Sequence, residues 1–262
     1  MDLPESVRIV EVGPRDGLQS QKRVYPLETK VKLVDLLVDA GFTTIEVTGL
    51  VKPDVIPQLA DASELLATLE RRPGVTYRAL CPNHKGTLRA VDSRVDEILG
   101  LMTASDGYNV KNAGMTWRDN VEDLVRSAEI AREASIPMVV AIGMAMFCPY
   151  EGDTPPERIH EIVARLWDEG VTSYYLAISV GLDNPRAVYD LTASLKDRWP
   201  DSVLGLHIHN TNGMGLANAL AGAQAGIEFF EGSICGIGGG IRMPYGMAPF
   251  GNVATEDLVH MF

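Results

Sequence analysis

Short apolar runs alternate with amphipathic segments from one end of the chain to the other, and this alternation restricts the fold more than any other feature. Eight runs are rich in β-branched and other apolar residues: VRIVEV (7–12), TTIEVTG (43–49), VTYRAL (75–80), VDEILGLM (95–102), PMVVAIGMAM (137–146), TSYYLAIS (172–179), SVLGLHIH (202–209) and IEFFEGSI (227–234). Near-continuous apolar character is typical of parallel strands that are covered on both faces. We therefore predict eight buried parallel strands.

The segments between these runs have the spacing of amphipathic helices. Residues 27–41 carry apolar side chains at 31, 33, 36, 37 and 40 and end at Gly41, a typical C-terminal cap. Residues 154–170 start with Thr-Pro-Pro, which places proline in the first turn, where its missing N–H is harmless. Similar patterns cover 60–72, 84–93, 117–134, 184–198 and 214–226.

Eight strands that are each followed by a helix predict an α/β protein with a (β/α)8 or TIM barrel, whose active site lies on the loops after the strands. No linker-like stretch divides the series, so we expect residues 1–262 to form a single catalytic domain. The eighth helix only begins at Ala254 before the chain stops at Phe262, which predicts that the last helix is truncated.

Charge and composition limit the classes of binding partner and the compartment that we expect for this protein. The formal net charge of −12 disfavours nucleic acid or an anionic membrane as a partner, although it leaves room for a local basic pocket. Three widely spaced cysteines, Cys81, Cys148 and Cys235, form no CxxC pattern and indicate free thiols in a reducing compartment. The sequence has no signal peptide pattern and no apolar run near the ~20 residues of a membrane helix, so we expect a cytoplasmic protein.

Two histidines one residue apart, His207 and His209, end the seventh predicted strand. Side chains two positions apart leave a strand from the same face, so both imidazoles can point into the barrel towards Asp16, which follows the first strand. Two imidazoles, a carboxylate and an amide oxygen leave room for substrate and water on a six-coordinate divalent ion. Oxygen ligands favour Mg²⁺ or Mn²⁺, and the imidazoles favour Mn²⁺ or a later metal. From the spacing alone, a hydrogen-bonded pair of strand histidines is an equally good interpretation.

Two further charged residues stand at strand ends. Arg15, beside Asp16, is either half of a surface ion pair or a guanidinium that stabilises an enolate or a carbonyl oxyanion. Glu46 lies in a strand made otherwise of Ile, Val and Thr, so it needs a partner, and Arg15 is the expected one. We favour this ion pair over proton transfer by Glu46.

The glycine run 236–240 and the pair Lys22 and Arg23 are weaker signals. The glycines suit either a phosphate cradle or a mobile loop over the site. Lys22 and Arg23 follow the first strand and could meet an anionic substrate, but a solvated charge pair explains them equally well.

With these residues in view, the chain resembles the 3-hydroxy-3-methylglutaryl-CoA lyase family, one of the metal-dependent barrel lyases and aldolases. The similarity covers essentially the whole chain, and its strongest motifs are VGPRDGLQSQK (12–22), AGFTTIEVTGLVKP (40–53), CPYEG (148–152), HIHNTNGMGLANALAGAQAGI (207–227) and GNVATEDLV (251–259). Together these motifs are far more specific than any one of them.

The resemblance implies a divalent ion held by Asp16, His207, His209 and Asn252. It also implies that Arg15 faces the thioester carbonyl of an acyl-CoA and that Gln19 lies in the substrate pocket. We therefore expect Arg15, Gln19 and Glu46 to bind substrate, and Arg15 and His207 to act in catalysis, with His207 moving protons. The implied reaction is a retro-Claisen cleavage of a 3-hydroxyacyl-CoA to acetyl-CoA and a keto product.

The chain also departs from the family pattern. The loop cysteine that serves the family as an acid is replaced by Gly240, and neither Cys148 nor Cys235 matches its place. Where the family has an aspartate on the sixth strand, this chain has Ile178. Two milder differences are Asn210 for a usual aspartate and Gly49 for serine. We expect these changes to share one pocket and to alter the substrate or the proton donor, with Arg242 and Tyr245 as new contacts.

Three hypotheses follow. The leading one is a divalent-metal-dependent carbon–carbon lyase for 3-hydroxy-3-methylglutaryl-CoA or a related hydroxyacyl-CoA. The second is a class II aldolase that cleaves a 4-hydroxy-2-oxo acid and does not bind CoA. The third is a catalytically silent barrel that binds metal or acyl-CoA. All three imply a small-molecule partner, an acyl-CoA or hydroxy acid, and pairing into a homodimer stays open.

Overall fold

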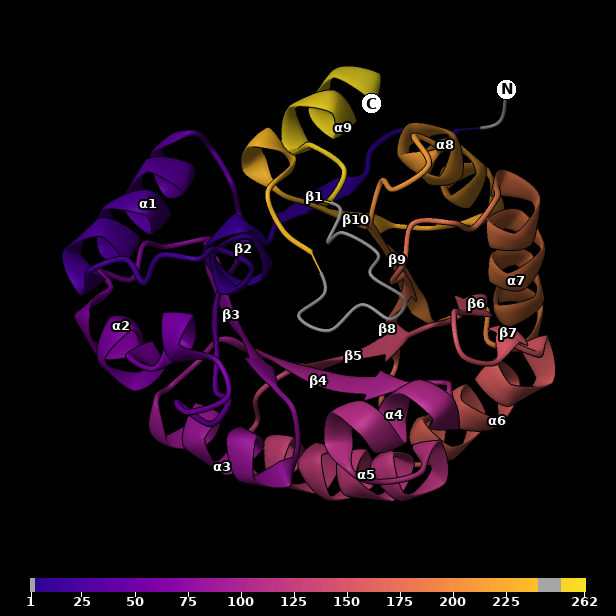
Figure 1. The fold of residues 1–262 in the computed structure, drawn as a ribbon, viewed down its shortest axis with the longest axis horizontal. Coiled ribbons are helices and arrows are strands. Elements are labelled where there is room, and N and C mark those ends of the chain that lie inside the picture. Colours follow the sequence, from indigo (N-terminus) through magenta and orange to yellow (C-terminus); the bar gives the residue numbers. More distant parts are fainter. Residues whose placement is uncertain (1–2, 240–250) are drawn as a thin grey trace.

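Every predicted apolar run contains a strand in the computed structural model, and eight strands close into a barrel (Figure 1). The structure describes residues 3–239 and 251–262. The barrel strands are β1 (Arg8–Glu11), β2 (Thr44–Gly49), β3 (Thr76–Cys81), β4 (Glu97–Thr103), β5 (Met138–Gly143), β8 (Ser173–Ile178), β9 (Val203–Ile208) and β10 (Phe229–Gly232). Neighbouring strands are parallel and follow the chain order, and β10 pairs with β1 to close the ring. The predicted (β/α)8 barrel is confirmed.

Helices surround the strands (Figure 1): α1 (Leu27–Asp39), α2 (Ala62–Thr68), α3 (His84–Asp92), α4 (Asp106–Ala113), α5 (Trp117–Glu133), α6 (Pro156–Trp167), α7 (Pro185–Arg198), α8 (Gly215–Ala225) and α9 (Thr255–Met261). Several ends have a local cause in the sequence. α5 begins at a capping box in which the side chains of Thr116 and Asp119 each accept the other's backbone N–H. Gly114 ends α4 with φ +73°, a left-handed conformation that glycine adopts at little cost.

The side chains of β9 alternate between two cores, one between the strands and the helices and one inside the barrel. Leu204, Leu206 and Ile208 pack outward against the helices, whereas Gly205 and His207 face the barrel interior. A Cβ on Gly205 would lie 2.2 Å from the ring of Phe229, so this position must be glycine for Phe229 to fill the interior. The interior is therefore a packed core, as in other barrels of this architecture.

Two small elements were not predicted from the sequence. Helix α4 lies between β4 and α5, and a short hairpin, β6 (Phe147–Cys148) with β7 (Gly152–Asp153), follows β5. The fifth strand was also predicted too long, because the apolar run continues to residue 146 while β5 ends at Gly143. At Met144 the backbone turns to φ +53°, and its N–H and carbonyl bond to Ser179 Oγ and Thr154 Oγ1. These hydrogen bonds to side chains take the place of the backbone hydrogen bonds that would continue β5.

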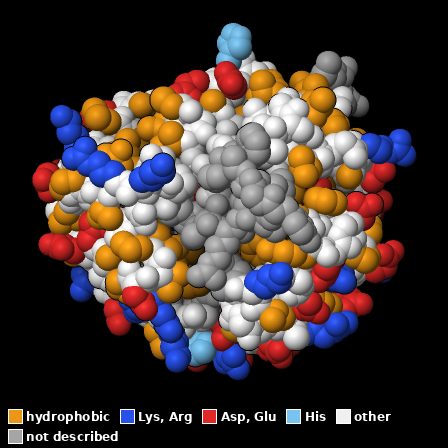
Figure 2. Space-filling model, viewed as in Figure 1, with side chains coloured by type: hydrophobic (Ala, Val, Ile, Leu, Met, Phe, Trp, Pro, Cys, Tyr) orange, Lys and Arg blue, Asp and Glu red, His pale blue; other side chains and the backbone are white. Residues whose placement is uncertain are grey.

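Charges of both signs are mixed on the face seen in Figure 2. Lys and Arg side chains there are interspersed with Asp and Glu rather than gathered into one patch. Within the described part of the chain, no helix has the length and apolar character needed to cross a bilayer.

Candidate metal centre

Asp16 lies on a π-helical turn, Gly13–Gly17, that directly follows β1. The carbonyl of Val12 accepts the backbone N–H groups of Arg15, Asp16 and Gly17, and this fixes the turn. Asp16 is 4 % exposed. Its Oδ1 accepts hydrogen bonds from Arg15 Nη1 and Gln19 Nε2, both at 2.7 Å, and its Oδ2 accepts one from Asn252 Nδ2 at 2.7 Å.

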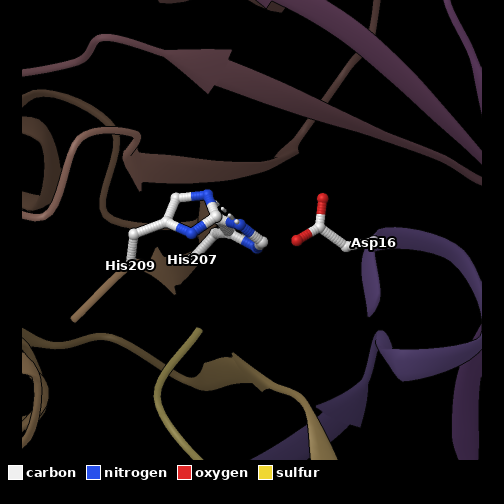
Figure 3. Close-up of side chains that lie close together, drawn as sticks. All are labelled: Asp16, His207 and His209. Carbon is white, nitrogen blue, oxygen red and sulfur yellow. Dashed lines mark hydrogen bonds between the residues drawn. The ribbon is translucent and has the colours of Figure 1, made fainter. Parts of the chain in front are cut away.

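His207 and His209 point to the same side of the chain, towards Asp16 (Figure 3). Their Nε2 atoms lie 3.4 Å apart, and the ligand atoms of the two histidines and Asp16 all lie within 4.8 Å of one another. All three side chains are buried. This is the spacing at which two imidazole nitrogens and a carboxylate oxygen can share one divalent ion.

Asn252 reaches the same place from the segment before α9. It forms an isolated antiparallel bridge with His209, and its Nδ2 donates to Asp16 Oδ2 and to the carbonyl of Ile237. Its buried Oδ1 has no hydrogen-bond partner among the described residues. An unpartnered amide oxygen beside a carboxylate and two imidazoles fits a site that a divalent cation completes. The structure thus gathers all four predicted ligands.

The electrostatics of the cluster also suit a cation. Burial acts to raise the pKa of Asp16, but Arg15, His209, His207 and the hydrogen bond from Asn252 outweigh it and lower the pKa to about 2. Asp16 is therefore ionised at neutral pH. The backbone comes very close on one side, since a Cβ on Gly238 would lie 2.4 Å from Asn252 Nδ2 and 2.7 Å from Asp16 Oδ2.

Arg15 and Glu46 form the predicted ion pair. Arg15 Nε and Nη2 donate to the two carboxylate oxygens of Glu46, and Arg15 Nη1 donates to Asp16. Glu46 is fully buried. Since both of its oxygens are used, Glu46 holds the guanidinium of Arg15 in place, and its direct contact with substrate stays a prediction.

Two buried charged residues beneath the histidines, Glu231 and Arg78, were not predicted from the sequence. Glu231 on β10 accepts a hydrogen bond through Oε2 from His207 Nδ1 at 2.8 Å, and its Oε1 accepts one from Arg78 Nη1 at 2.6 Å. Arg78 also donates through Nε to Glu97. The sequence did contain a signal for them, because Arg78 and Glu231, like Glu46, are charged residues within apolar runs and therefore need buried partners.

The ring of Tyr175 on β8 stacks on His207, with 5.6 Å between ring centroids and 21° between planes. Burial, with the nearby carboxylates of Glu231 and Glu46, raises the pKa of Tyr175 well above its ordinary value, so the phenol keeps its proton. Glu231 likewise acts on His207: burial alone would lower the pKa of His207, but the hydrogen bond and charge of Glu231 raise it.

The expectation that the departures from the family pattern share one pocket is wrong for Ile178 and Asn210. Ile178 packs in the outer core between the strands and the helices, together with Leu176 and Ile208. Asn210 Oδ1 accepts the backbone N–H of Gly215 at the start of α8. These side chains do not join the ligand cluster. Ile178 follows the inward-facing Ala177 and Asn210 follows His209, and successive side chains of an extended chain point to opposite sides.

The remaining candidates are placed as follows. Gln19 contacts Asp16, Lys22 and Arg23 are exposed, Cys148 is buried against Ser105, and Cys235 is exposed. Gly236 to Gly239 are described, but Gly240, Arg242 and Tyr245 lie outside the described residues. The predicted roles of this loop therefore stay predictions.

Comparisons with known proteins identify relatives of the whole chain. The family model HMGL-like matches residues 6–262. A 3-hydroxy-3-isohexenylglutaryl-CoA/hydroxy-methylglutaryl-CoA lyase of Pseudomonas aeruginosa is 37% identical over 261 residues, which cover 100% of this chain and 86% of the relative. The solved structure of an HMG-CoA lyase from Bacillus subtilis matches with a TM-score of 0.94 at 35% identity, covering 100% of this chain and 87% of that one. An HMG-CoA lyase from Acinetobacter baumannii, solved with coenzyme A and 3-methylmalate, matches with a TM-score of 0.91 at 32% identity, covering 97% and 82%.

Proposed function

We propose that this chain, which belongs to the HMGL-like family and is a carbon–carbon lyase, is divalent-metal-dependent and cleaves 3-hydroxy-3-methylglutaryl-CoA or a close relative to acetyl-CoA and a keto acid. The observation that carries the proposal is the convergence of Asp16, His207 and His209 at the end of the barrel strands. The match to the family over residues 6–262 supports the same proposal.

Asp16, His207, His209 and Asn252 would hold the ion, through a carboxylate oxygen, two Nε2 atoms and an amide oxygen. When bound, a Mg²⁺ or Mn²⁺ ion polarises the hydroxyl and carboxylate oxygens of a chelating substrate and lowers the pKa of the hydroxyl. Four protein ligands would leave coordination positions free for these substrate oxygens.

Arg15 would stabilise the charge that develops on the thioester oxygen. When a base takes the proton of the substrate hydroxyl, C3–O becomes a carbonyl and the C2–C3 bond breaks. Its electron pair moves to C2 and is delocalised onto the thioester oxygen as an enolate, which takes up a proton at C2 to give acetyl-CoA. A guanidinium has five N–H donors, and Arg15 uses three of them on Glu46 and Asp16. The remaining donors can face the enolate oxygen while Glu46 prevents the side chain from turning away.

His207 stays our proposed catalytic residue beside Arg15. Its Nε2 faces the ligand cluster, and its Nδ1 lies 2.8 Å from Glu231 Oε2. A proton can be held between Nδ1 and this carboxylate, next to the proposed ligand cluster, and this is the proton that His207 would contribute. Gln19, which donates to Asp16, and Glu46 complete the proposed substrate-binding set.

An acyl-CoA is the proposed substrate class, since the Acinetobacter baumannii relative was solved with coenzyme A. The name of the Pseudomonas aeruginosa relative includes an isohexenyl as well as a methyl substrate, so a longer substituent at C3 belongs to the proposed range. We also propose that residues 1–262 act as one catalytic domain, because the pairing of β1 with β10 closes the barrel with strands from both ends of the chain.

The test is incubation of the purified protein with Mn²⁺ or Mg²⁺ and either 3-hydroxy-3-methylglutaryl-CoA or its 3-isohexenyl analogue. We expect acetyl-CoA to form with at least one of them, and chelation with EDTA to stop it. A protein that binds Mn²⁺ but releases no acetyl-CoA from either substrate contradicts the proposal. Titration with free CoA then separates an acyl-CoA enzyme from an aldolase, which should not bind CoA.

A further inference from the structure

Glu11, the last residue of β1, receives hydrogen bonds from three separate segments of the chain. Its Oε1 accepts the backbone N–H of Gly13 at 2.7 Å and that of Ile234 at 3.0 Å. Its Oε2 accepts the hydroxyl of Thr255 at 2.7 Å. The side chain is fully buried. It lies on the outer side of β1, because its neighbours Val10 and Val12 belong to the interior core.

Each of the three segments carries or supports a proposed metal ligand. Gly13 opens the π-helical turn that contains Asp16. Thr255 begins α9, three residues after Asn252. Ile234 begins the segment that leads to Gly238, the residue packed directly against both ligands.

Backbone hydrogen bonds reinforce the same junction. Ser233 N donates to the carbonyl of Val253, and Thr255 N donates to the carbonyl of Ser233. These bonds link the exit of β10 to the Asn252 segment, but they do not reach the turn of Asp16. Among the described residues, the Glu11 carboxylate joins this pair of segments to the backbone of that turn, in addition to the direct hydrogen bond from Asn252 to Asp16.

The contact between Glu11 and Gly13 depends on the residue type at position 13. A Cβ on Gly13 would lie 2.6 Å from Glu11 Oε1, so only glycine lets the turn approach the carboxylate. In contrast to Asp16, Glu46, Glu97 and Glu231, which each contact an arginine, Glu11 has no ion-pair partner among the described residues. A buried carboxylate held by hydrogen bonds alone is costly.

Burial accordingly raises the pKa of Glu11 to about 7, although the donors Thr255, Ile234 and Gly13 act to lower it. An apolar side chain of similar volume would avoid this cost. What Glu11 contributes, and an apolar side chain could not, is its hydrogen bonds to Gly13, Ile234 and Thr255. All three hold segments next to the ligand cluster in place.

We propose that Glu11 is a positioning residue for the metal centre: its hydrogen bonds to Gly13, Ile234 and Thr255 set the separation of Asp16 and Asn252 at which both can bind one ion. This rests on the proposed metal-dependent function. Glu11 touches neither ion nor substrate and acts through the backbone of the segments that carry the ligands.

The test compares Glu11→Ala and Glu11→Gln in the full chain, by titration calorimetry with Mn²⁺ alone and by thermal melts in EDTA. Glu11→Ala removes all three contacts, so we expect Mn²⁺ affinity to fall by at least about tenfold. Glu11→Gln should stay within about threefold of wild type. Its Oε1 can accept both N–H groups while its Nε2 donates to Thr255 Oγ1, so the amide rescues the geometry without the charge.

Glu256→Ala is the matched control, because Glu256 accepts the N–H of Cys235 in the same segment without reaching the turn of Asp16. We expect it to keep wild-type Mn²⁺ affinity. If Glu11→Ala does not fold, Thr255→Val removes one contact and should weaken Mn²⁺ binding measurably.

Two outcomes are distinct. Wild-type protein that does not bind Mn²⁺ refutes the proposed metal-dependent function itself. Wild-type protein that binds Mn²⁺, with Glu11→Ala binding it equally well or Glu11→Gln failing as badly as Glu11→Ala, overturns only the positioning role. A lower melting temperature in EDTA with unchanged Mn²⁺ affinity would likewise show a merely structural residue.

Discussion

His207 and Glu231 are paired directly across neighbouring strands, and His207 Nδ1 lies 2.8 Å from Glu231 Oε2. Residues opposite each other in parallel strands point to the same side of the sheet, so the register of β9 and β10 itself brings the carboxylate under the imidazole. With Nδ1 occupied in this way, Nε2 is the nitrogen left to face Asp16 and His209. Arg78, fully buried, holds the other oxygen of Glu231.

Replacement of Glu231 by glutamine should therefore weaken metal binding. The amide can accept from His207 or from Arg78 with its oxygen, but its NH2 then faces the other donor. We expect Mn²⁺ affinity to fall about 10–100-fold by calorimetry. Glu97→Gln is the matched control, since Glu97 contacts Arg78 and not His207. Equal loss in both variants would mean that Arg78, rather than the orientation of His207, decides the affinity.

Asp16→Asn should abolish the stabilisation of the fold by metal. A ligand at about 100 times its Kd stabilises a protein by about 2.7 kcal/mol, so the wild-type melting temperature should rise on addition of Mn²⁺ and fall back in EDTA. The variant should melt alike in both. Asn210→Ala is the control: it removes the cap on Gly215 and should lower the melting temperature, yet keep the rise with Mn²⁺. A full Mn²⁺ response in Asp16→Asn would remove Asp16 from the ligand set.

Ile178→Asp should destabilise the barrel and add nothing to catalysis. The side chain is fully buried in the outer core, so the new carboxylate would face Leu176 and Ile208 rather than the ligands. We expect the free energy of unfolding in urea to fall by about 3–5 kcal/mol, as for an uncompensated buried charge. Ile178→Val should cost only about 0.5–1.5 kcal/mol. A stable Ile178→Asp protein with higher lyase activity would show that this position faces the site.

Asp183, in the loop after β8, should make stability depend on pH. Burial, followed by the charge of Asp153, raises its pKa to about 7. Because the folded state binds this proton more tightly than the unfolded state, stability is lost as the pH rises from about 4 to about 7 and then levels off. Asp183→Asn should lack this loss and become the more stable protein above pH 7. Urea unfolding across this range measures it.

Asp153→Asn serves as the companion variant for this effect. It removes the neighbouring charge and leaves the burial of Asp183 unchanged, so the loss of stability with pH should shrink without disappearing. A profile for Asp183→Asn that follows the wild type at every pH would assign the pH dependence to other groups.

The sequence by itself determined the order of strands and helices and the two-residue spacing that puts His207 and His209 on one side. These are local properties, because strand periodicity and helix caps depend on neighbouring residues. The motifs around Asp16 and Asn252 also marked both as predicted ligands, although 236 positions separate the two residues, which share a hydrogen bond.

Only the tertiary structure decided which face of each strand turns inward and which buried charges meet. Strands that are apolar on both faces carry no signal for the inner face. Ile178 was expected in the site because it matches a family aspartate, and only the barrel shows its side chain packed towards the helices. Arg78 lies 153 positions from Glu231 and Thr255 lies 244 positions from Glu11, and these two pairs come into contact only when β1 pairs with β10. Ring closure fixes those distances, and no short-range pattern encodes a distance that depends on the whole ring.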